Sequence, residues 1–448
     1  MSLVDASCRT QEFTDRLAVT CFVPDPGHVI PLLKIAAQVR QTCDILVVVP
    51  DELVSLVNDY GFRAVGVGPV RPEGGQLELQ RYIAVSEWLR VISAHAACEE
   101  KYYGPLKSGI LRSFPRHHTV LREYRPTCIL SDNHGLVSSE AKHHLRSLKV
   151  PVFLHLPTAF LRTHHDTWSL HHCHWRGYRI AMRDVVRKTK NEFGLLAKRW
   201  SATRRRIHRP IDFDKMPPLG AAKQGFTNLA TGTSFLEAAL LGEHLLYTGA
   251  DHLVLPALPP LESPLPQELH DWLEQFPDGG VVYVSFGTLV RPDIATAMRI
   301  VRAASAQGRS VLLHYSGQFP ATPGVRHEQW VPQAKVLLHP AISLFITHGG
   351  AGSVEESLWY GKPMLCIPGV WDHYYTSWIV SLLGAGISLP RRSVRSHRRL
   401  SAAVQRGLMP QYADGARSIA GMMRKHWSEN ESAVAGLFSV SGKARQTH

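Results

Sequence analysis

The chain has 448 residues, of which 44% are apolar and 19% charged, and its formal net charge is +13. This length exceeds one ordinary core and predicts two domains, and the composition excludes a disordered or fibrous protein. The seven cysteines are scattered and odd in number, which indicates a reduced, cytoplasmic protein and not a disulfide framework. We expect no signal peptide and no integral membrane segment, because no basic-then-apolar leader and no bilayer-length apolar run occurs.

Strand-like and helix-like stretches alternate through residues 1–250, which we predict to be the N-terminal domain. The clearest strand-like runs are Leu17–Val23, Asp44–Val49, Ala64–Val67, Cys128–Ser131 and Val150–Leu156. Alternation of this kind is typical of an α/β domain that is built on a parallel sheet.

Two polar residues follow strands of this first domain. His28 lies in the segment PDPGHVIP, directly after the first strand, and Asp132 follows the strand Cys128–Ser131. The carboxyl ends of parallel strands are where open α/β sheets bind ligands. Two other interpretations stay open, because a lone loop histidine is often a plain surface residue and an Asp at this place could cap the next helix.

A proline-rich segment separates the two predicted domains. Five prolines fall among the eleven residues from Pro256 to Pro266, and we predict a stiff linker over residues 251–275. A second α/β series is expected over residues 276–420. Apolar residues at helical spacing continue into residues 421–448, for which we predict a helical tail.

The second series begins with a strand-like run, Val281–Ser285, that leads into a turn. Gly287 and Thr288 in this turn offer a backbone N–H group and a hydroxyl as hydrogen-bond donors. Any parallel strand could end in this way, so these two residues are informative only in combination with the glycine-rich segment downstream.

The segment from Trp330 to His373 is the most informative part of the chain. Two strand-like runs, Leu344–Thr347 and Met364–Ile367, bracket a helical stretch that begins in the glycine-rich turn His348–Ser353. Glycines so close to a helix start leave free N–H groups pointing outward, and such a nest suits a diphosphate. An ordinary Rossmann-like domain with a core Trp and a surface Glu is the alternative.

This segment resembles the donor-binding box of family-1 UDP-dependent glycosyltransferases. The residues in register with that box are Trp330, Pro332, Gln333, His348, Gly350, Ser353, Glu356, Pro368 and Asp372. The resemblance implies the GT-B fold, which has two facing Rossmann-like domains with parallel sheets and a C-terminal helix that crosses back onto the first domain. Enzymes of this fold use a UDP-sugar as co-substrate and need no metal or other cofactor.

The resemblance also implies a role for each residue of the box. Trp330 would stack on uracil beside Val331, and Gln333 and Glu356 would hold the ribose hydroxyls. Residues near the diphosphate and the sugar complete the expected donor site: Gly287, Thr288, His348, Gly350, Gly352 and Ser353 at the diphosphate, Asp372 and His373 at the sugar. The chemistry agrees, since an aromatic face suits a base and a carboxylate accepts from vicinal hydroxyls.

Three positions depart from the family pattern. Ala351 and Gly352 stand where plant members usually carry Trp and Asn, which places the chain closer to microbial or animal relatives. The box ends in His373, where glucose-using members commonly have Gln. In similar plant enzymes a His at this place accompanies galactose transfer, so the donor sugar stays open.

The upstream loop resembles the catalytic loop of the same family. Its pattern is Pro-x-x-Gly-His-x-x-Pro, and the family's histidine is a general base. By this resemblance His28 is the base, and Asp132 fixes its tautomer and stabilises the imidazolium.

Further clusters have alternative interpretations. Arg204–Arg206 and Arg391–Arg399 lack a nucleic-acid recognition motif, so we expect a solvated face that attracts anionic donors or a membrane surface. The histidines from His164 to His174 match no standard zinc spacing. The aromatic residues between Leu156 and Tyr178 form either a wall of the acceptor pocket or a buried cluster.

The sequence therefore predicts an inverting glycosyltransferase that moves a sugar from a UDP-sugar to a hydroxyl of an apolar or aromatic small molecule. The alternatives are a sterol or lipid glycosyltransferase and a non-catalytic nucleotide-sugar-binding subunit. We expect a monomer or a weak dimer, and no nucleic-acid partner. The acceptor is not readable, because variable loops of the first domain build its pocket.

Overall fold

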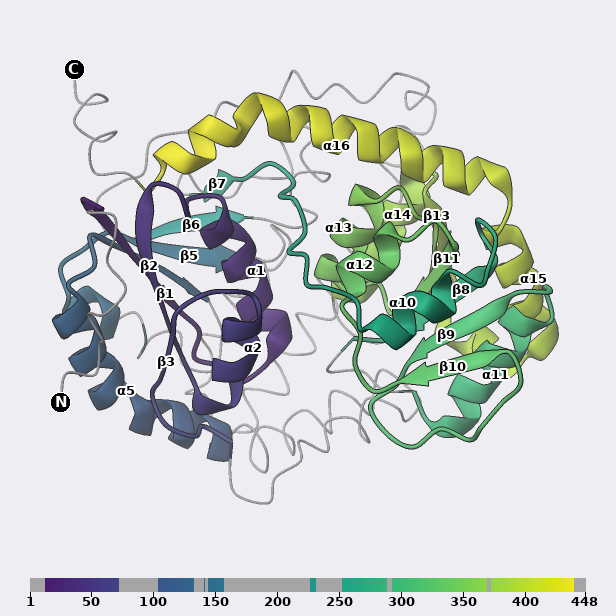
Figure 1. Ribbon diagram of the computed structural model, residues 1–448, viewed down its shortest axis with the longest axis horizontal. Coiled ribbons are helices and arrows are strands. Elements are labelled where there is room, and N and C mark those ends of the chain that lie inside the picture. Colours follow the sequence, from purple (N-terminus) through teal and green to yellow (C-terminus); the bar gives the residue numbers. More distant parts are fainter. Residues whose placement is uncertain are drawn as a thin grey trace, which may run out of the picture.

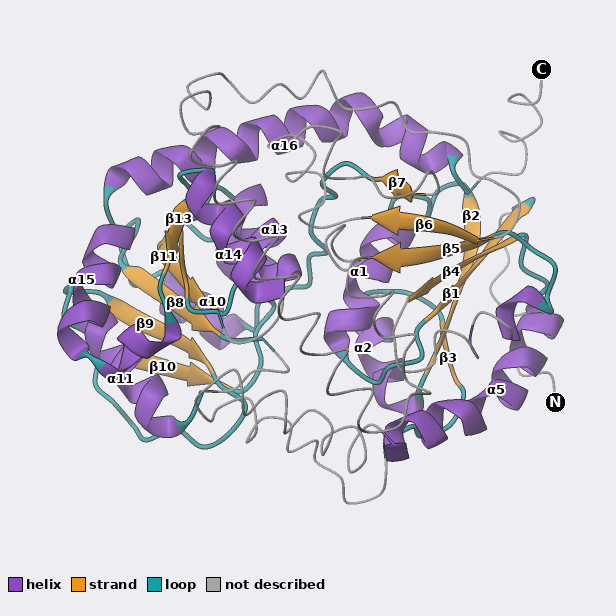
Figure 2. Cartoon of the chain, turned by 180° about the vertical axis from the view of Figure 1, so that it is seen from behind, coloured by secondary structure: helices purple, strands orange, loops and turns teal. Residues whose placement is uncertain are grey.

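The structure is a computed structural model, and it describes residues 13–71, 104–132, 141, 144–156, 226–230, 252–287, 292–368 and 372–438. Two parallel sheets, one of seven and one of six strands in this part of the chain, lie side by side with helices packed around them (Figure 1). In Figure 2 the arrowheads of both sheets point toward the middle of the molecule. The carboxyl ends of the two sets of strands therefore face each other, as the GT-B prediction requires.

The first sheet has the strand order β3-β2-β1-β4-β5-β6-β7. Its elements in chain order are β1 (Asp15–Thr20), α1 (Pro26–Ala37), β2 (Cys43–Val49), η1 (Asp51–Leu53), α2 (Val54–Asp59), β3 (Ala64–Gly66), α5 (Gly104–Tyr124), β4 (Cys128–Asp132), β5 (Val152–Leu156), β6 (Phe226–Ala230) and β7 (His252–Val254). The central strands are apolar on both faces because helices cover both. The first strand ends earlier than the sequence predicted, since the chain leaves β1 after Thr20 to reach the start of α1.

The second sheet has the strand order β10-β9-β8-β11-β12-β13. Its elements are α10 (Gln267–Leu273), β8 (Val281–Ser285), α11 (Ile294–Ser305), β9 (Ser310–His314), β10 (Val325–Glu328), α12 (Gln333–Leu338), β11 (Ile342–Thr347), α13 (Ala351–Trp359), β12 (Met364–Cys366), α14 (Asp372–Leu382), β13 (Gly386–Ser388), η4 (Arg391–Arg395), α15 (His397–Gly407) and α16 (Pro410–Gly436). Both strand runs that were predicted to bracket the glycine-rich turn are present, as β11 and β12.

The predicted linker, residues 251–275, is more structured than its prolines suggested. Strand β7 pairs in parallel with β6, and α10 begins directly after Pro266. A three-residue strand has too few residues to show a hydrophobic period, which is why the sequence did not reveal it. The irregular part is thus the proline-rich stretch itself, and Leu255 and Leu258 within it are buried.

The tail helix also differs from its prediction, because α16 starts at Pro410 and not at residue 421. Pro410 occupies the first helical turn, where a missing N–H costs nothing. Gly415 lets the helix approach its neighbour closely, since a Cβ at this position would lie 2.3 Å from the carbonyl oxygen of Gly384. The described part of the predicted tail continues this one long helix.

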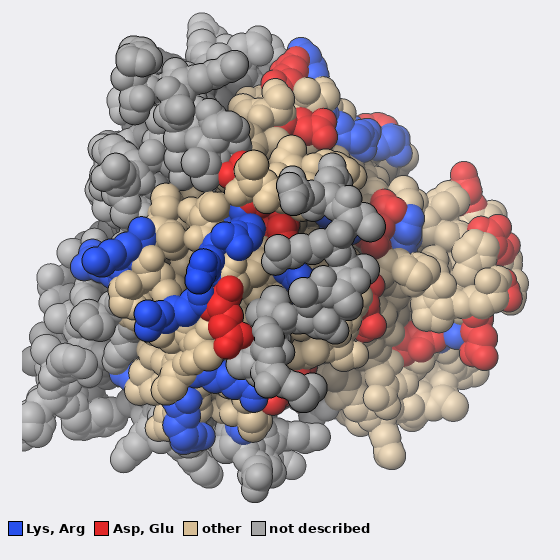
Figure 3. Space-filling view, turned by 60° about the vertical axis from the view of Figure 1, so that its left-hand side comes forward, with Lys and Arg blue, Asp and Glu red and all other residues tan. Residues whose placement is uncertain are grey.

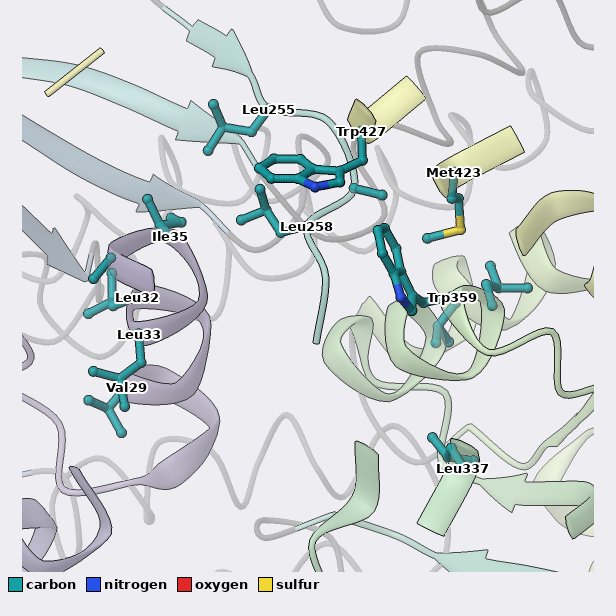
Figure 4. Close-up of a cluster of buried hydrophobic side chains, with 14 of the residues drawn as sticks. Val29, Leu32, Leu33, Ile35, Leu255, Leu258, Leu337, Trp359, Met423 and Trp427 are labelled. Carbon is teal, nitrogen blue, oxygen red and sulfur yellow. The ribbon is translucent and has the colours of Figure 1, made fainter. Parts of the chain in front are cut away.

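Helix α16 crosses from the second sheet to the first (Figure 1). It packs on α13 near its start, and just beyond its end Phe438 lies against Phe153 of β5, with 4.8 Å between the ring centroids. Trp427 and Met423 of this helix lie near Trp359 and Leu258 (Figure 4). One cluster of buried apolar side chains includes residues of both sheets, so the two halves share part of their core.

The positive charge is mixed with acidic side chains on the surface (Figure 3). Helix α5 exposes Arg112, Arg116 and Arg122 next to Glu123, and α15 exposes Arg398 and Arg399. Interspersed charges of this kind are typical of a solvated face. The predicted cluster Arg204–Arg206 lies outside the described residues. No helix in the described ranges combines the length and apolarity needed to cross a bilayer.

Candidate active site

His28 and Asp132 meet at the carboxyl edge of the first sheet. Asp25 caps α1 by accepting a hydrogen bond from Gly27 N at 2.7 Å, which places His28 in the first turn of the helix. Asp132 is the last residue of β4, the direct neighbour of β1. The distance from His28 Nδ1 to Asp132 Oδ2 is 3.8 Å. This distance is within ion-pair range and is longer than a hydrogen bond.

Asp132 is held by the surrounding backbone and is almost fully buried. Its Oδ1 accepts from Phe22 N at 3.1 Å, while its buried Oδ2 has no hydrogen-bond partner among the described residues. Burial raises the pKa of Asp132 to about 6, and the nearby His28 and the Phe22 N–H group oppose this rise. The His28 side chain keeps 27% of its surface exposed, so it is open to a substrate while its partner is not.

A second histidine lies beside this pair and was not predicted. His155 of β5 is in register with Asp132 and is buried. Burial lowers its pKa to about 3, and the positive charges of His28 and Lys34 lower it further. The imidazole of His155 is therefore neutral at physiological pH. The only signal in the sequence was a polar residue close to the end of an apolar strand.

The second sheet presents a row of polar side chains at its own carboxyl edge. Ser285 ends β8, and its register partners are His314 at the end of β9 and Thr347 at the end of β11. Ser285 Oγ lies 2.9 Å from His314 Nδ1. Burial is the main cause that lowers the pKa of His314. His314 was missed in the sequence for the same reason as His155.

The predicted anion nest lies where β11 passes into α13. Gly349 has a φ of +80°, which an L side chain rarely adopts, and Gly350 is the N-cap of α13. A Cβ at Gly350 would lie 2.4 Å from His348 Nε2, and one at Gly287 would lie 2.8 Å from His348 Cε1. A side chain at either position would collide with the imidazole of His348, so glycine is needed at both. A Cβ at Gly352, two residues further along the chain, would meet nothing within 4 Å, so the first helical turn is open to a ligand.

Two neutral imidazoles stand beside this nest. His348 and His373 are both buried, and their ring centroids are 4.3 Å apart in an edge-to-face arrangement. Burial lowers the pKa of His348 well below its ordinary value, and the neighbouring His373 lowers it further. Burial also lowers the pKa of His373 to about 3. The favourable field for an anion therefore comes from the helix start and its N–H groups, not from charged histidines.

The groups expected to hold a nucleoside converge close to the nest. Trp330 is half exposed at 50%, whereas the adjacent Val331 is buried. Gln333 opens α12, and its Nε2 donates to Glu356 Oε2 at 2.7 Å and to Ser353 Oγ at 3.2 Å. Burial raises the pKa of Glu356, while Lys34 and the Gln333 hydrogen bond oppose that rise. Residues that lie 20 and 23 positions apart in the chain thus form one connected polar group.

Some predicted residues fall outside what the structure describes. Thr288 is one of them, and so are the histidines from His164 to His174 and most of the aromatic stretch that ends at Tyr178. Asp372 begins helix α14, but its side chain is not described. Within the described ranges, no group of three or more His, Cys, Asp or Glu residues is placed to hold a metal ion.

Comparison with known proteins gives its clearest matches in the second half of the chain. Residues 259–414 match the family of UDP-glucuronosyl and UDP-glucosyl transferases. The rabbit (Oryctolagus cuniculus) UDP-glucuronosyltransferase 2C1 is 31% identical over 160 residues, which are 35% of this chain and 32% of that protein. The human (Homo sapiens) 2-hydroxyacylsphingosine 1-beta-galactosyltransferase is 34% identical over 165 residues, or 35% and 30% of the two chains. The match thus spans about a third of the length of these curated relatives.

Solved structures show the same overall fold over nearly the whole chain. The UDP-glucose: anthocyanidin 3-O-glucosyltransferase in complex with UDP has a TM-score of 0.60 and 16% identity, and the match covers 96% of this chain and 99% of that one. The glycotransferase of kitacinnamycin has a TM-score of 0.59 and 20% identity, with 95% and 99% covered.

By fold, the chain is a GT-B protein, as the sequence predicted. Its residues 259–414 belong to the family of UDP-dependent glycosyltransferases, which confirms the resemblance found in the donor box.

Proposed function

We propose that the protein transfers a sugar from a UDP-sugar to a hydroxyl group of an apolar or aromatic small molecule, with inversion at the anomeric carbon. The proposal rests on one observation: the carboxyl edges of the two sheets face each other, and each edge carries different chemical groups. The His28–Asp132 pair lies at the edge of one sheet, and the nest at the start of α13 lies at the edge of the other. A substrate between them would meet a base on one side and an anion site on the other.

The chemistry at the first edge is proton removal. The acceptor oxygen attacks the anomeric carbon, its proton passes to His28, and the bond between the anomeric carbon and the phosphate oxygen breaks. Asp132 stabilises the imidazolium that results, because its carboxylate oxygen already faces His28 Nδ1. Attack on the side opposite to the leaving UDP inverts the configuration.

The chemistry at the second edge is donor binding and stabilisation of the leaving UDP. In this proposal Trp330 stacks on uracil beside Val331, and Gln333 and Glu356 bind the ribose. The diphosphate meets the N–H groups of the nest together with groups around it: Gly287, Thr288, His348, Gly350, Gly352 and Ser353. Asp372 and His373 bind the sugar. Preformed donors of this kind act where negative charge grows in the transition state, and no metal is required.

A lipid or sterol acceptor is the second candidate. One of the relatives is by name a galactosyltransferase for 2-hydroxyacylsphingosine, and His373 replaces the Gln of glucose-using members. The basic surface is compatible with a peripheral contact at a membrane. A non-catalytic nucleotide-sugar-binding subunit is disfavoured, because such a subunit would not need the His28–Asp132 pair.

We propose a cytoplasmic protein that works as a monomer or a weak dimer without nucleic acid. Support for the reducing compartment comes from the cysteines, since Cys21, Cys43 and Cys366 are buried thiols that form no disulfide with a described residue.

The test is UDP release from three donors, UDP-glucose, UDP-galactose and UDP-glucuronic acid, each against phenolic and sphingolipid or sterol acceptors. Transfer to phenols supports the first candidate, and transfer to lipids alone supports the second. The anomeric configuration of the product, read by proton NMR, decides whether the reaction inverts. UDP binding without any transfer would favour the binding subunit instead.

A further inference from the structure

A buried ion pair joins the two halves of the molecule close to the proposed active site. Lys34 Nζ of α1 lies 2.5 Å from Glu355 Oε2 of α13, and the two side chains are only 5% and 6% exposed. The other carboxylate oxygen, Glu355 Oε1, accepts from Leu258 N of the proline-rich stretch at 3.4 Å. Lys34 lies outside the catalytic loop, and Glu355, although it falls within the segment Trp330–His373, is not one of the residues to which the box assigns a role.

This pair is not explained by stability. Taking two charges out of water is costly, and a buried pair is often replaceable by apolar residues of similar size with little loss. Removing only one partner is strongly destabilising, because the other charge is left buried. Glu355 also lies beside a second, half-buried carboxylate, Glu356, which makes the position more costly still. A buried pair of this kind fixes the geometry between the elements that carry it.

The two elements that the pair joins are the ones that carry the chemistry. Helix α1 bears His28 in its first turn and Lys34 near its end. Helix α13 begins at the nest and bears Glu355 next to Glu356. We propose that Lys34 is a positioning residue, which sets His28 against the bound nucleotide-sugar by fixing α1 to Glu355. This rests on the proposed function above.

Lys34 and Glu355 have opposite effects on the pKa of Glu356, which belongs to the proposed nucleoside site. The positive charge of Lys34 lowers the pKa of Glu356, whereas the negative charge of Glu355 raises it. The effect of Lys34 is the larger one, so removing both charges together changes the pKa of Glu356 less than removing Lys34 alone. UDP binding, which uses the second half of the chain, should then survive the loss of the pair while the alignment with His28 does not.

The experiment compares Lys34→Met, Glu355→Met and the double variant in the full chain. Each single variant is expected to unfold at a lower temperature, and the double variant to recover most of that loss. The double variant should nevertheless lose about 100-fold in kcat, the scale that a misplacement of about 1 Å produces. Its affinity for UDP should stay within about threefold of the wild type. Lys425→Met, which removes a partner of the exposed Lys425–Glu429 pair, is the matched control and should change none of these.

Two kinetic or binding outcomes would overturn the proposal. A double variant with the kcat of the wild type would show that the pair is only structural. A double variant that loses UDP affinity in proportion to kcat would show an effect on the nucleotide site and not on alignment.

Small-angle X-ray scattering separates this proposal from the proposed function. A wider distance distribution in the double variant is expected if the pair holds the halves together, and an unchanged one contradicts it. A wild type that neither binds UDP nor transfers sugar refutes the proposed function, and the scattering comparison then still decides whether Lys34 fixes the two helices.

Discussion

The two sheet edges that face each other differ in how their polar groups are charged. The edge of the first sheet carries the His28–Asp132 pair, in which the pKa of Asp132 is raised to about 6 and the side chain of His28 stays partly exposed. The edge of the second sheet carries the half-buried His314 and the buried His348 and His373, and the pKa values of all three are lowered. One edge is thus suited to exchange a proton and the other to hold an anion with neutral donors. Changes at the first edge should alter the rate and its pH dependence, and changes at the second should alter binding.

The largest effect is expected at His28. His28→Ala should lower turnover by about two to four orders of magnitude, the usual contribution of a positioned general base. UDP binding should persist, because the residues proposed to bind UDP lie in the other half. Steady-state kinetics together with calorimetry of UDP binding would check this. Near-normal turnover in a folded variant would refute the role of His28.

Asp132→Asn should lower turnover by less than the His28 variant, by about 100-fold. If Asp132 acts through His28, the double variant His28→Ala/Asp132→Asn should be little slower than His28→Ala alone. Losses that multiply in full would show that the two residues act separately. In the wild type, turnover should fall as the pH drops through about 6, because a protonated Asp132 no longer stabilises the imidazolium.

The same Asp132→Asn variant should be more stable than the wild type at pH 8. The pKa of Asp132 in the folded protein lies above the value of about 3.9 in an unfolded chain, so the folded state binds the proton more tightly. Its contribution to stability therefore falls as the pH rises from about 4 to about 6 and stays low above that range. Removing the charge should raise the free energy of unfolding at pH 8 by about 3 kcal/mol, since each of the roughly two pKa units corresponds to about 1.4 kcal/mol. Denaturant unfolding at pH 8 and pH 5 would test this, and a gain that is larger at pH 5 would contradict it.

At the second edge, Trp330→Ala should weaken UDP binding by about 1–3 kcal/mol, the usual contribution of a base stacked on an aromatic ring. Trp330 is already half exposed, so its loss should leave the fold intact. Calorimetry would measure the affinity, and circular dichroism would control for folding. Unchanged affinity in a folded variant would remove Trp330 from the nucleoside site.

The smallest effect is expected for His373→Gln. This change should shift the ratio of UDP-glucose to UDP-galactose turnover toward glucose by about tenfold, because one or two hydrogen bonds distinguish the two C4 hydroxyl directions. Competition between the two donors would measure the ratio. An unchanged ratio would mean that His373 does not contact the sugar and serves through its packing on His348.

The fold and the donor box could be predicted because their signals are local in the sequence. Strands β8 and β11 are short apolar runs, and the turn at His348–Ser353 follows directly from the glycines. The hydrogen bond between Gln333 and Glu356 links two residues that the box already placed together. The roles of these residues remain predictions.

The features that could not be predicted depend on contacts across strands and between halves. The Ser285–His314 contact joins neighbouring strands, His155 lies beside Asp132 only through sheet register, and Lys34 meets Glu355 across 321 residues. No local pattern encodes such pairs. The start of helix α16 was also missed, although Pro410 in its first turn is a sequence signal for a helix start.

The chain passes between the two sheets twice, once through the proline-rich stretch and once through helix α16. The two passages lie together, with Leu258 of the first beside Trp427 of the second (Figure 4). Two adjacent connections that pack on each other keep the halves in one particle and limit how far they can move apart. A protease cut within residues 255–266 should therefore leave both fragments associated under native conditions, since α16 and its packing would hold them as one particle.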